Sequence, residues 1–143
     1  MPQTRDKSNF DIDLDFGNVS EQEIVDMFES DGRIEVKTER DMWIQTGNIV
    51  FEIKGHEGRL SGLSVTEATW WIQCLNYRNQ NLMMLTFRVK FLKIVLKKMI
   101  KEKTARLVKG GDNNYSTMIL APIQQLMKEY INYDEIHRQD YKW

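Results

Sequence analysis

Cysteine and histidine are scarce in this chain of 143 residues, and each scarcity excludes one way of stabilising a small fold. Cys74 is the single cysteine, so no internal disulfide can hold the fold, and one thiol is typical of a reducing compartment. The two histidines, His56 and His137, lack the spacing of zinc ligands. No apolar run approaches the roughly 18 residues of a membrane-spanning helix. We therefore expect a cytoplasmic protein that acts without a membrane partner.

The length suits one compact domain, and we expect residues 1–143 to form it. A share of 41% apolar and 29% charged residues is typical of a globular protein. Acidic and apolar residues alternate over residues 11–16, within a segment 1–16 that we expect to be a loosely ordered arm or an edge strand.

The net charge of −1 conceals a strong segregation of charge along the chain. Residues 1–60 contain 14 acidic and 7 basic side chains, whereas residues 86–110 contain nine basic side chains and one acidic one. Such a basic segment can hold a polyanion such as a nucleic acid. The alternative is the solvated face of an amphipathic helix that is rich in lysine.

Sequence periodicity predicts an α/β (α+β) domain in which helices flank a small mixed β-sheet, in the order α-β-β-α-β-α-β-β-α. The expected helices run from the N-cap Ser20 to residues 31–32, over 66–77, over 90–103, and from Pro122 onward. The expected strands cover 32–40, 48–54, 82–89, 105–109 and 115–121.

The expected helix over 90–103 has one apolar face and one basic face. Its apolar positions are Leu92, Val95, Leu96 and Met99. Its opposite face carries the candidate nucleic-acid-binding residues Lys90, Lys93, Lys97 and Lys101. A phosphate backbone could follow these four ammonium groups.

Two expected strands place acidic and basic side chains on shared faces. Side chains at i and i+2 lie on one face of a strand, so Glu35, Lys37 and Glu39 project together, as do Glu52 and Lys54. If the two strands form a hairpin around residues 43–47, all five groups converge. Carboxylates then hold Mg²⁺ or Mn²⁺, and a lysine positions the attacking water. The alternative is a ladder of exposed salt bridges, which contributes little to stability.

The residues from Glu21 to about Leu75 resemble the nuclease core of the PD-(D/E)XK superfamily, which includes archaeal Holliday-junction resolvases, restriction endonucleases and small phage nucleases. The phrases GRIEVKTER, TGNIVFEIKG and LSVTEATWW carry this resemblance. It implies a restriction-endonuclease-like core and a divalent-metal-dependent endonuclease that hydrolyses DNA, with branched DNA as a candidate substrate. It also implies a homodimer, because two strands must be cut symmetrically. A phage-encoded enzyme of this type acts in the host cytoplasm and needs no small-molecule cofactor besides the metal.

The resemblance implies catalytic roles for Glu21, Glu35, Lys37 and Glu52. Glu21 takes the place of the family's helical glutamate, and the three glutamates would be the metal ligands while Lys37 acts on the water.

The chain departs from the family pattern because it has no Pro-Asp pair, which leaves the register open. In one register Asp31 precedes the Glu35-x-Lys37 motif. In the other, Glu35 or Glu39 is the first acid, and the motif is Glu52-x-Lys54. Asp31, Glu39 and Lys54 are therefore reserve candidates.

Two functions of other classes stay open. A non-catalytic nucleic-acid-binding module with a degraded nuclease fold would keep the basic helix and bind without cleavage. A structural protein would instead use the tryptophans and the eight methionines as an oligomer interface.

Overall fold

The structure is a computed structural model that describes residues 21–29 and 33–138. These fall in two compact units, Met1–Ile34 and Glu35–Trp143. In the first unit, residues 21–29 form a helix, as predicted. The predicted arm over 1–16, the N-cap Ser20 and the reserve candidate Asp31 lie outside the described residues.

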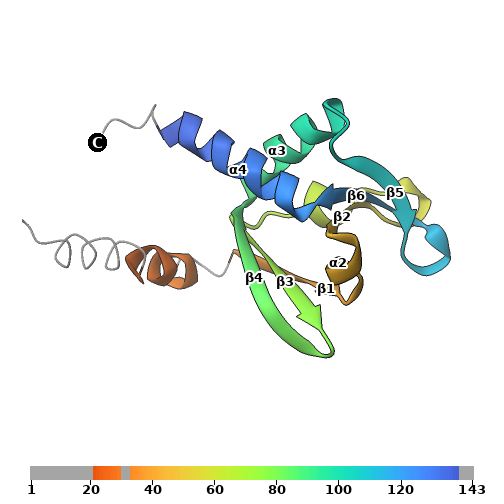
Figure 1. Ribbon diagram of the computed structural model, residues 1–143, viewed down its shortest axis with the longest axis horizontal. Coiled ribbons are helices and arrows are strands. Elements are labelled where there is room, and N and C mark those ends of the chain that lie inside the picture. Colours follow the sequence, from red (N-terminus) through yellow and green to blue (C-terminus); the bar gives the residue numbers. More distant parts are fainter. Residues whose placement is uncertain (1–20, 30–32, 139–143) are drawn as a thin grey trace, which may run out of the picture. The chain divides into compact units, whose positions relative to one another are not determined.

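The strands form two three-stranded sheets (Figure 1). One has the order β1-β3-β4, from Ile34–Arg40, Trp70–Tyr77 and Gln80–Arg88. The other has the order β2-β6-β5, from Asn48–Lys54, Ser116–Pro122 and Arg106–Gly110. The predicted class, a mixed fold of small sheets and flanking helices, is confirmed.

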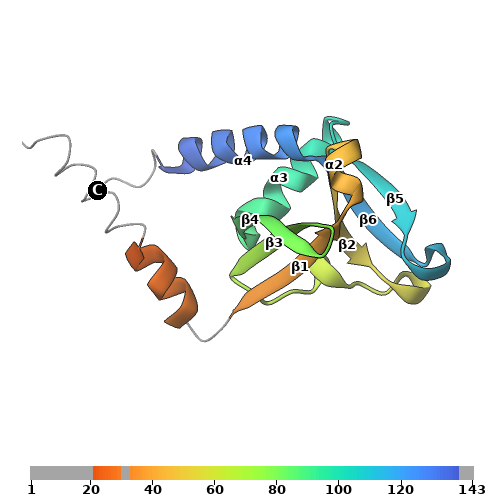
Figure 2. The same ribbon diagram turned by 60° about the horizontal axis from the view of Figure 1, so that its bottom comes forward.

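Three further helices complete the described chain: α2 (Met42–Thr46), α3 (Val89–Lys101) and α4 (Ile123–Arg138). Short 3-10 turns cover His56–Gly58, Gly62–Ser64 and Asp112–Asn114. Helices α3 and α4 contact each other, and in Figure 2 α4 runs along the top of the view with α3 below it. In the part of the chain described, no helix is both long and apolar enough to cross a membrane.

The predicted helix over 66–77 is wrong, because this segment contains strand β3. β3 pairs antiparallel with β4 through a two-residue turn, Arg78-Asn79, in which both residues have positive φ (50° and 63°). Positive φ at both positions defines a hairpin turn whose usual sequence signal is Asn-Gly or Asp-Gly. The turn has Arg-Asn in place of either dipeptide, so the local sequence gives no hairpin signal and its apolar run favours a helix.

The predicted hairpin between residues 32–40 and 48–54 is also wrong, because β1 and β2 belong to different sheets. Helix α2 separates them, and β2 pairs antiparallel with β6, with Phe51 opposite Ile119. The two charged strands thus have partners that follow much later in the sequence.

One hydrophobic core joins the two sheets and α3. The ring of Phe51 lies 6.1 Å from that of Trp71 and 6.5 Å from that of Phe87, between centroids. The apolar face predicted for the basic helix is confirmed: Leu92, Val95, Leu96 and Met99 are all buried. The strand predicted over 82–89 is present as β4, but the burial that its continuous apolar run predicts is wrong for its first half, because β4 is an edge strand with exposed apolar residues there.

Candidate active site and basic face

Glu35 and Lys37 form an ion pair on one face of β1. Lys37 Nζ lies 2.9 Å from Glu35 Oε1, and the side chain of Lys37 is 48% exposed and that of Glu35 27% exposed. Thr66 also acts on the Glu35 carboxyl and helps to lower its pKa. An acid and a cation therefore meet at a surface that solvent and a substrate can reach.

The Glu35 carboxyl is held in its ionised form. Partial burial opposes its charge, but the hydrogen bonds from Thr66 and Lys37 and the positive charge of Lys37 outweigh burial and lower its pKa below the usual range. Glu35 is thus available as an oxygen ligand for a cation at neutral pH.

Trp71 restricts the position of Lys37. The Lys37 ammonium lies 5.9 Å from the centroid of the Trp71 ring, within the range of a cation–π contact. Trp71 is buried, so its ring is a fixed support next to the ion pair.

Glu52 lies apart from this pair. Phe51 points toward Trp71, so Glu52, the next residue of β2, points to the opposite face of its own sheet. There Glu52 Oε1 accepts a hydrogen bond of 2.7 Å from Ser61 Oγ. Among the described residues no hydrogen bond or ion pair joins Glu52 to Glu35, and the expected convergence across a hairpin is absent.

Glu39 connects the two sheets. Its Oε2 accepts hydrogen bonds from the Val50 amide of β2 (3.2 Å) and from Gln73 Nε2 of β3 (3.1 Å). Burial raises the pKa of Glu39, and these two hydrogen bonds oppose the shift without cancelling it. The Glu39 carboxylate therefore serves to connect Val50 and Gln73 within the fold.

Two other candidates belong to other elements of the chain. Glu21 is exposed on the helix over 21–29, in the first unit, and Lys54 is exposed at the end of β2. Within residues 21–29 and 33–138, no three His, Cys, Asp or Glu side chains gather as a group that could hold a metal ion.

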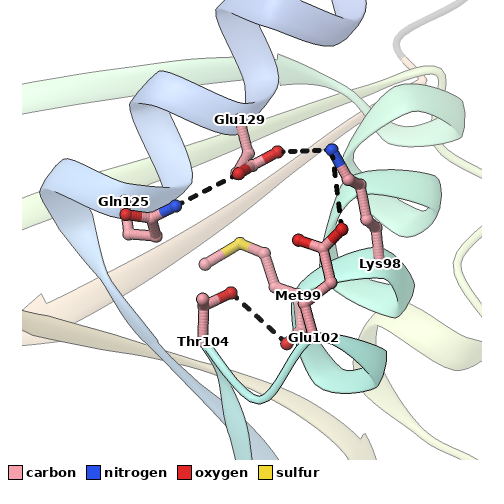
Figure 3. Close-up of polar contacts among 6 residues, drawn as sticks. All are labelled: Lys98, Met99, Glu102, Thr104, Gln125 and Glu129. Carbon is pink, nitrogen blue, oxygen red and sulfur yellow. Dashed lines mark hydrogen bonds and ion pairs between the residues drawn. The ribbon is translucent and has the colours of Figure 1, made fainter.

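The lysines of α3 separate into two sets. Lys98 Nζ contacts Glu129 Oε2 at 2.8 Å and Glu102 Oε1 at 3.9 Å, and these partners raise its pKa (Figure 3). The hydrogen bond from Gln125 also holds Glu129 in place (Figure 3). In the described chain the four lysines of the opposite face form no ion pair: Lys90, Lys93, Lys97 and Lys101. We call these four the basic face.

A hollow of about 270 Å³ lies beside the basic face. Lys93 and Lys97 line it together with apolar side chains and with Ser64. Thr66, two residues after Ser64, acts on the Glu35 carboxyl and helps to lower its pKa. The segment 60–66 therefore approaches both the basic face and the Glu35–Lys37 pair.

Sequence reasoning missed Ser61, Thr66 and Gln73. A serine or threonine in a glycine-rich loop carries no local signal for the carboxylate that it will meet. Gln73 is buried and also accepts a hydrogen bond of 2.8 Å from Trp71 Nε1. Its alternation with Trp71 and Leu75 would have indicated its role if the segment had been read as a strand.

No protein-family model matches this chain, and no curated protein or solved structure does so either. Its function must therefore be inferred from the site itself.

Proposed function

We propose that this protein is a divalent-metal-dependent nuclease with Glu35 and Lys37 at its reaction centre. The observation that carries the proposal is the 2.9 Å contact between an ionised, accessible carboxylate and an ammonium group on one strand face. The resemblance of the surrounding sequence to the PD-(D/E)XK superfamily supports the same reading.

The residues at this site suit Mg²⁺ or Mn²⁺. Magnesium keeps several of its waters and is bound by one or two carboxylates together with substrate phosphates, so Glu35 can be the protein ligand without a cage of acids. Such an ion supplies a Lewis acid for the phosphate and lowers the pKa of a bound water. Glu52 points away from Glu35 and accepts a hydrogen bond from Ser61, so the proposed site holds the ion without Glu52.

The chain's own side chains would do the remaining work. Thr66 and Lys37 orient the Glu35 carboxylate. The Lys37 ammonium would neutralise the negative charge that develops on the phosphate as the bond to oxygen breaks. The basic face would hold the phosphates of DNA, with branched DNA as the candidate substrate.

Cleavage of DNA by the purified protein tests the proposal. Supercoiled plasmid and a four-way junction are incubated with the protein in Mg²⁺, in Mn²⁺ and in EDTA. We expect cleavage that requires the metal and stops in EDTA. If neither substrate is cut in either metal while the protein is folded, the proposal is wrong.

A second candidate is a nucleic-acid-binding protein without catalysis. It is favoured because Glu39 and Glu52 already accept hydrogen bonds from other residues of this chain, whereas the lysines of the basic face form no ion pair in the described chain. Salt-sensitive binding of DNA without cleavage in any metal would establish this function in place of the first.

A further inference from the structure

The hollow beside the basic face has a mostly aliphatic wall. Leu63, Leu96 and Ile119 line it and are themselves buried, whereas Leu60, which also lines it, is exposed. The hollow thus has an inner part that is removed from water and an outer part that solvent reaches. Pockets for small molecules usually hold roughly 300–1,000 Å³. A volume of about 270 Å³ therefore suits a ligand near the lower end of that range.

The loop over 60–64 forms one wall of the hollow and is fixed to β2. The Ser61 amide donates a hydrogen bond of 3.0 Å to Ile53 O. Gly62 lies so close to the Glu52 backbone that an added Cβ would collide with it. This wall is therefore in place before any ligand arrives, and a preformed site loses less affinity to ordering.

The hollow carries positive charge at its wall. Among the described residues that line it, only Lys93 and Lys97 are charged, and neither forms an ion pair in the described chain. They lie four residues apart on α3, so they are neighbours on the helix surface and their like charges repel each other. Lysine stems lie along apolar surface while the ammonium group stays in water. An anion between the two ammonium groups would relieve the repulsion.

We propose that this hollow binds a free fatty acid of medium chain length, with the chain against the aliphatic wall and the carboxylate between Lys93 and Lys97. A phosphate of DNA could also meet the two lysines, but it brings no apolar group to the wall. An aliphatic chain removes that wall from water, and a carboxylate forms charge-assisted hydrogen bonds with ammonium groups. The inference goes beyond the proposed nuclease function and does not rest on it.

Calorimetric titration of the full chain with hexanoate, octanoate and decanoate, each below its micelle concentration, tests the binding. Each added pair of methylene groups should tighten binding about tenfold while the chain still enters the hollow. Decyltrimethylammonium has the same chain length as decanoate and a cationic head group. It should bind at least about tenfold more weakly than decanoate.

Variants of the exposed side chains locate the site. Lys93→Gln combined with Lys97→Gln should weaken decanoate binding at least about tenfold. Lys90→Gln combined with Lys101→Gln is the matched control, because it removes the same charge from α3 outside the hollow. It should change the affinity by less than about twofold. Leu60→Asp places a negative charge on the wall and should also weaken binding.

Methyl resonances give a second readout that needs no variant. Decanoate should shift the methyl signals of Leu63, Leu96 and Ile119, which line the hollow. The signals of Leu107, which is exposed on β5 and does not line the hollow, should stay in place.

A folded wild type that does not bind decanoate would overturn the inference. So would equal affinity for decanoate and decyltrimethylammonium, or a folded double variant of Lys93 and Lys97 that binds decanoate as the wild type does. If a DNA oligonucleotide shifts the methyl signals of the hollow and decanoate does not, the hollow is part of a DNA-binding surface and the inference is wrong.

Discussion

Gln73 Nε2 donates a hydrogen bond of 3.1 Å to Glu39 Oε2, and this contact ties β3 to β1. The same carboxylate oxygen accepts the Val50 amide of β2, so one acidic side chain holds three strands from two sheets. A residue that the sequence offers as a metal ligand is thus a structural acceptor.

Glu39→Gln should stabilise the protein more at pH 7 than at pH 4. The folded state raises the pKa of Glu39 above 4.5, so the native protein binds the proton more tightly than the unfolded chain. The contribution of Glu39 to stability therefore falls as the pH rises above the unfolded value. Glutamine keeps an acceptor oxygen and has no charge to bury. Urea denaturation of both proteins at both pH values measures the difference.

Glu39→Ala is the companion variant. It leaves the amides of Gln73 and Val50 without their acceptor, and we expect a loss of about 1–3 kcal/mol at both pH values. A Glu39→Gln effect that does not vary with pH, or a Glu39→Ala effect near zero, would contradict the role assigned to Glu39.

Gly62→Ala should be strongly destabilising. Gly62 has a φ of +52°, and an added Cβ would collide with the backbone carbonyl of Glu52. Gly58 also has positive φ (+70°) but has open space around it, so Gly58→Ala isolates the backbone strain. We expect Gly58→Ala to cost about 1 kcal/mol and Gly62→Ala at least about 2 kcal/mol more. Equal melting temperatures for the two variants would show that the close approach of Gly62 to the Glu52 carbonyl does not limit the residue at position 62.

Lys93→Ala combined with Lys97→Ala should weaken DNA binding in a salt-dependent way. Loss of two phosphate contacts should lower the slope of log affinity against log salt by about 2. Lys98→Ala is the control, because Glu129 and Glu102 already engage its ammonium. Titrations at several salt concentrations decide the matter, and an equal change of slope in Lys98→Ala would argue against the basic face.

Lys37→Gln should shift the pH dependence of cleavage. Lys37 helps to lower the pKa of Glu35, so its removal raises that pKa, and the acidic limb of the pH–rate profile moves to higher pH. The rate at neutral pH should also fall, by roughly 10- to 100-fold, because the ammonium no longer offsets developing charge. An acidic limb that stays at the wild-type pH would show that Lys37 does not control the ionisation of Glu35 during cleavage.

The sequence predicts best what depends on neighbouring residues. Helix α3 was predicted with its buried residues in place, because a 3.6-residue period is visible within four turns. The Glu35–Lys37 pair was predicted for the same reason, since i and i+2 share a strand face.

Features that depend on distant partners were not predictable. The partner of β2 is β6, more than 60 residues later, and that pairing turns Glu52 away from Glu35. β3 has tryptophans, isoleucine and leucine that suit a buried helix or a strand equally well. Its pairing with β4 decides between them.

The cleavage rate of Glu35→Gln is the most direct test of the proposed reaction centre. Single-turnover cleavage of the four-way junction in Mn²⁺ is compared for the wild type, Glu35→Gln and Glu57→Gln, with circular dichroism to verify the fold. Glu57 also lies near a cation, with Oε2 3.5 Å from Arg59 Nη2, and its side chain is exposed. We predict a loss of at least about 100-fold for Glu35→Gln and a change within about twofold for Glu57→Gln. A folded Glu35→Gln variant that cuts at the wild-type rate would contradict the account.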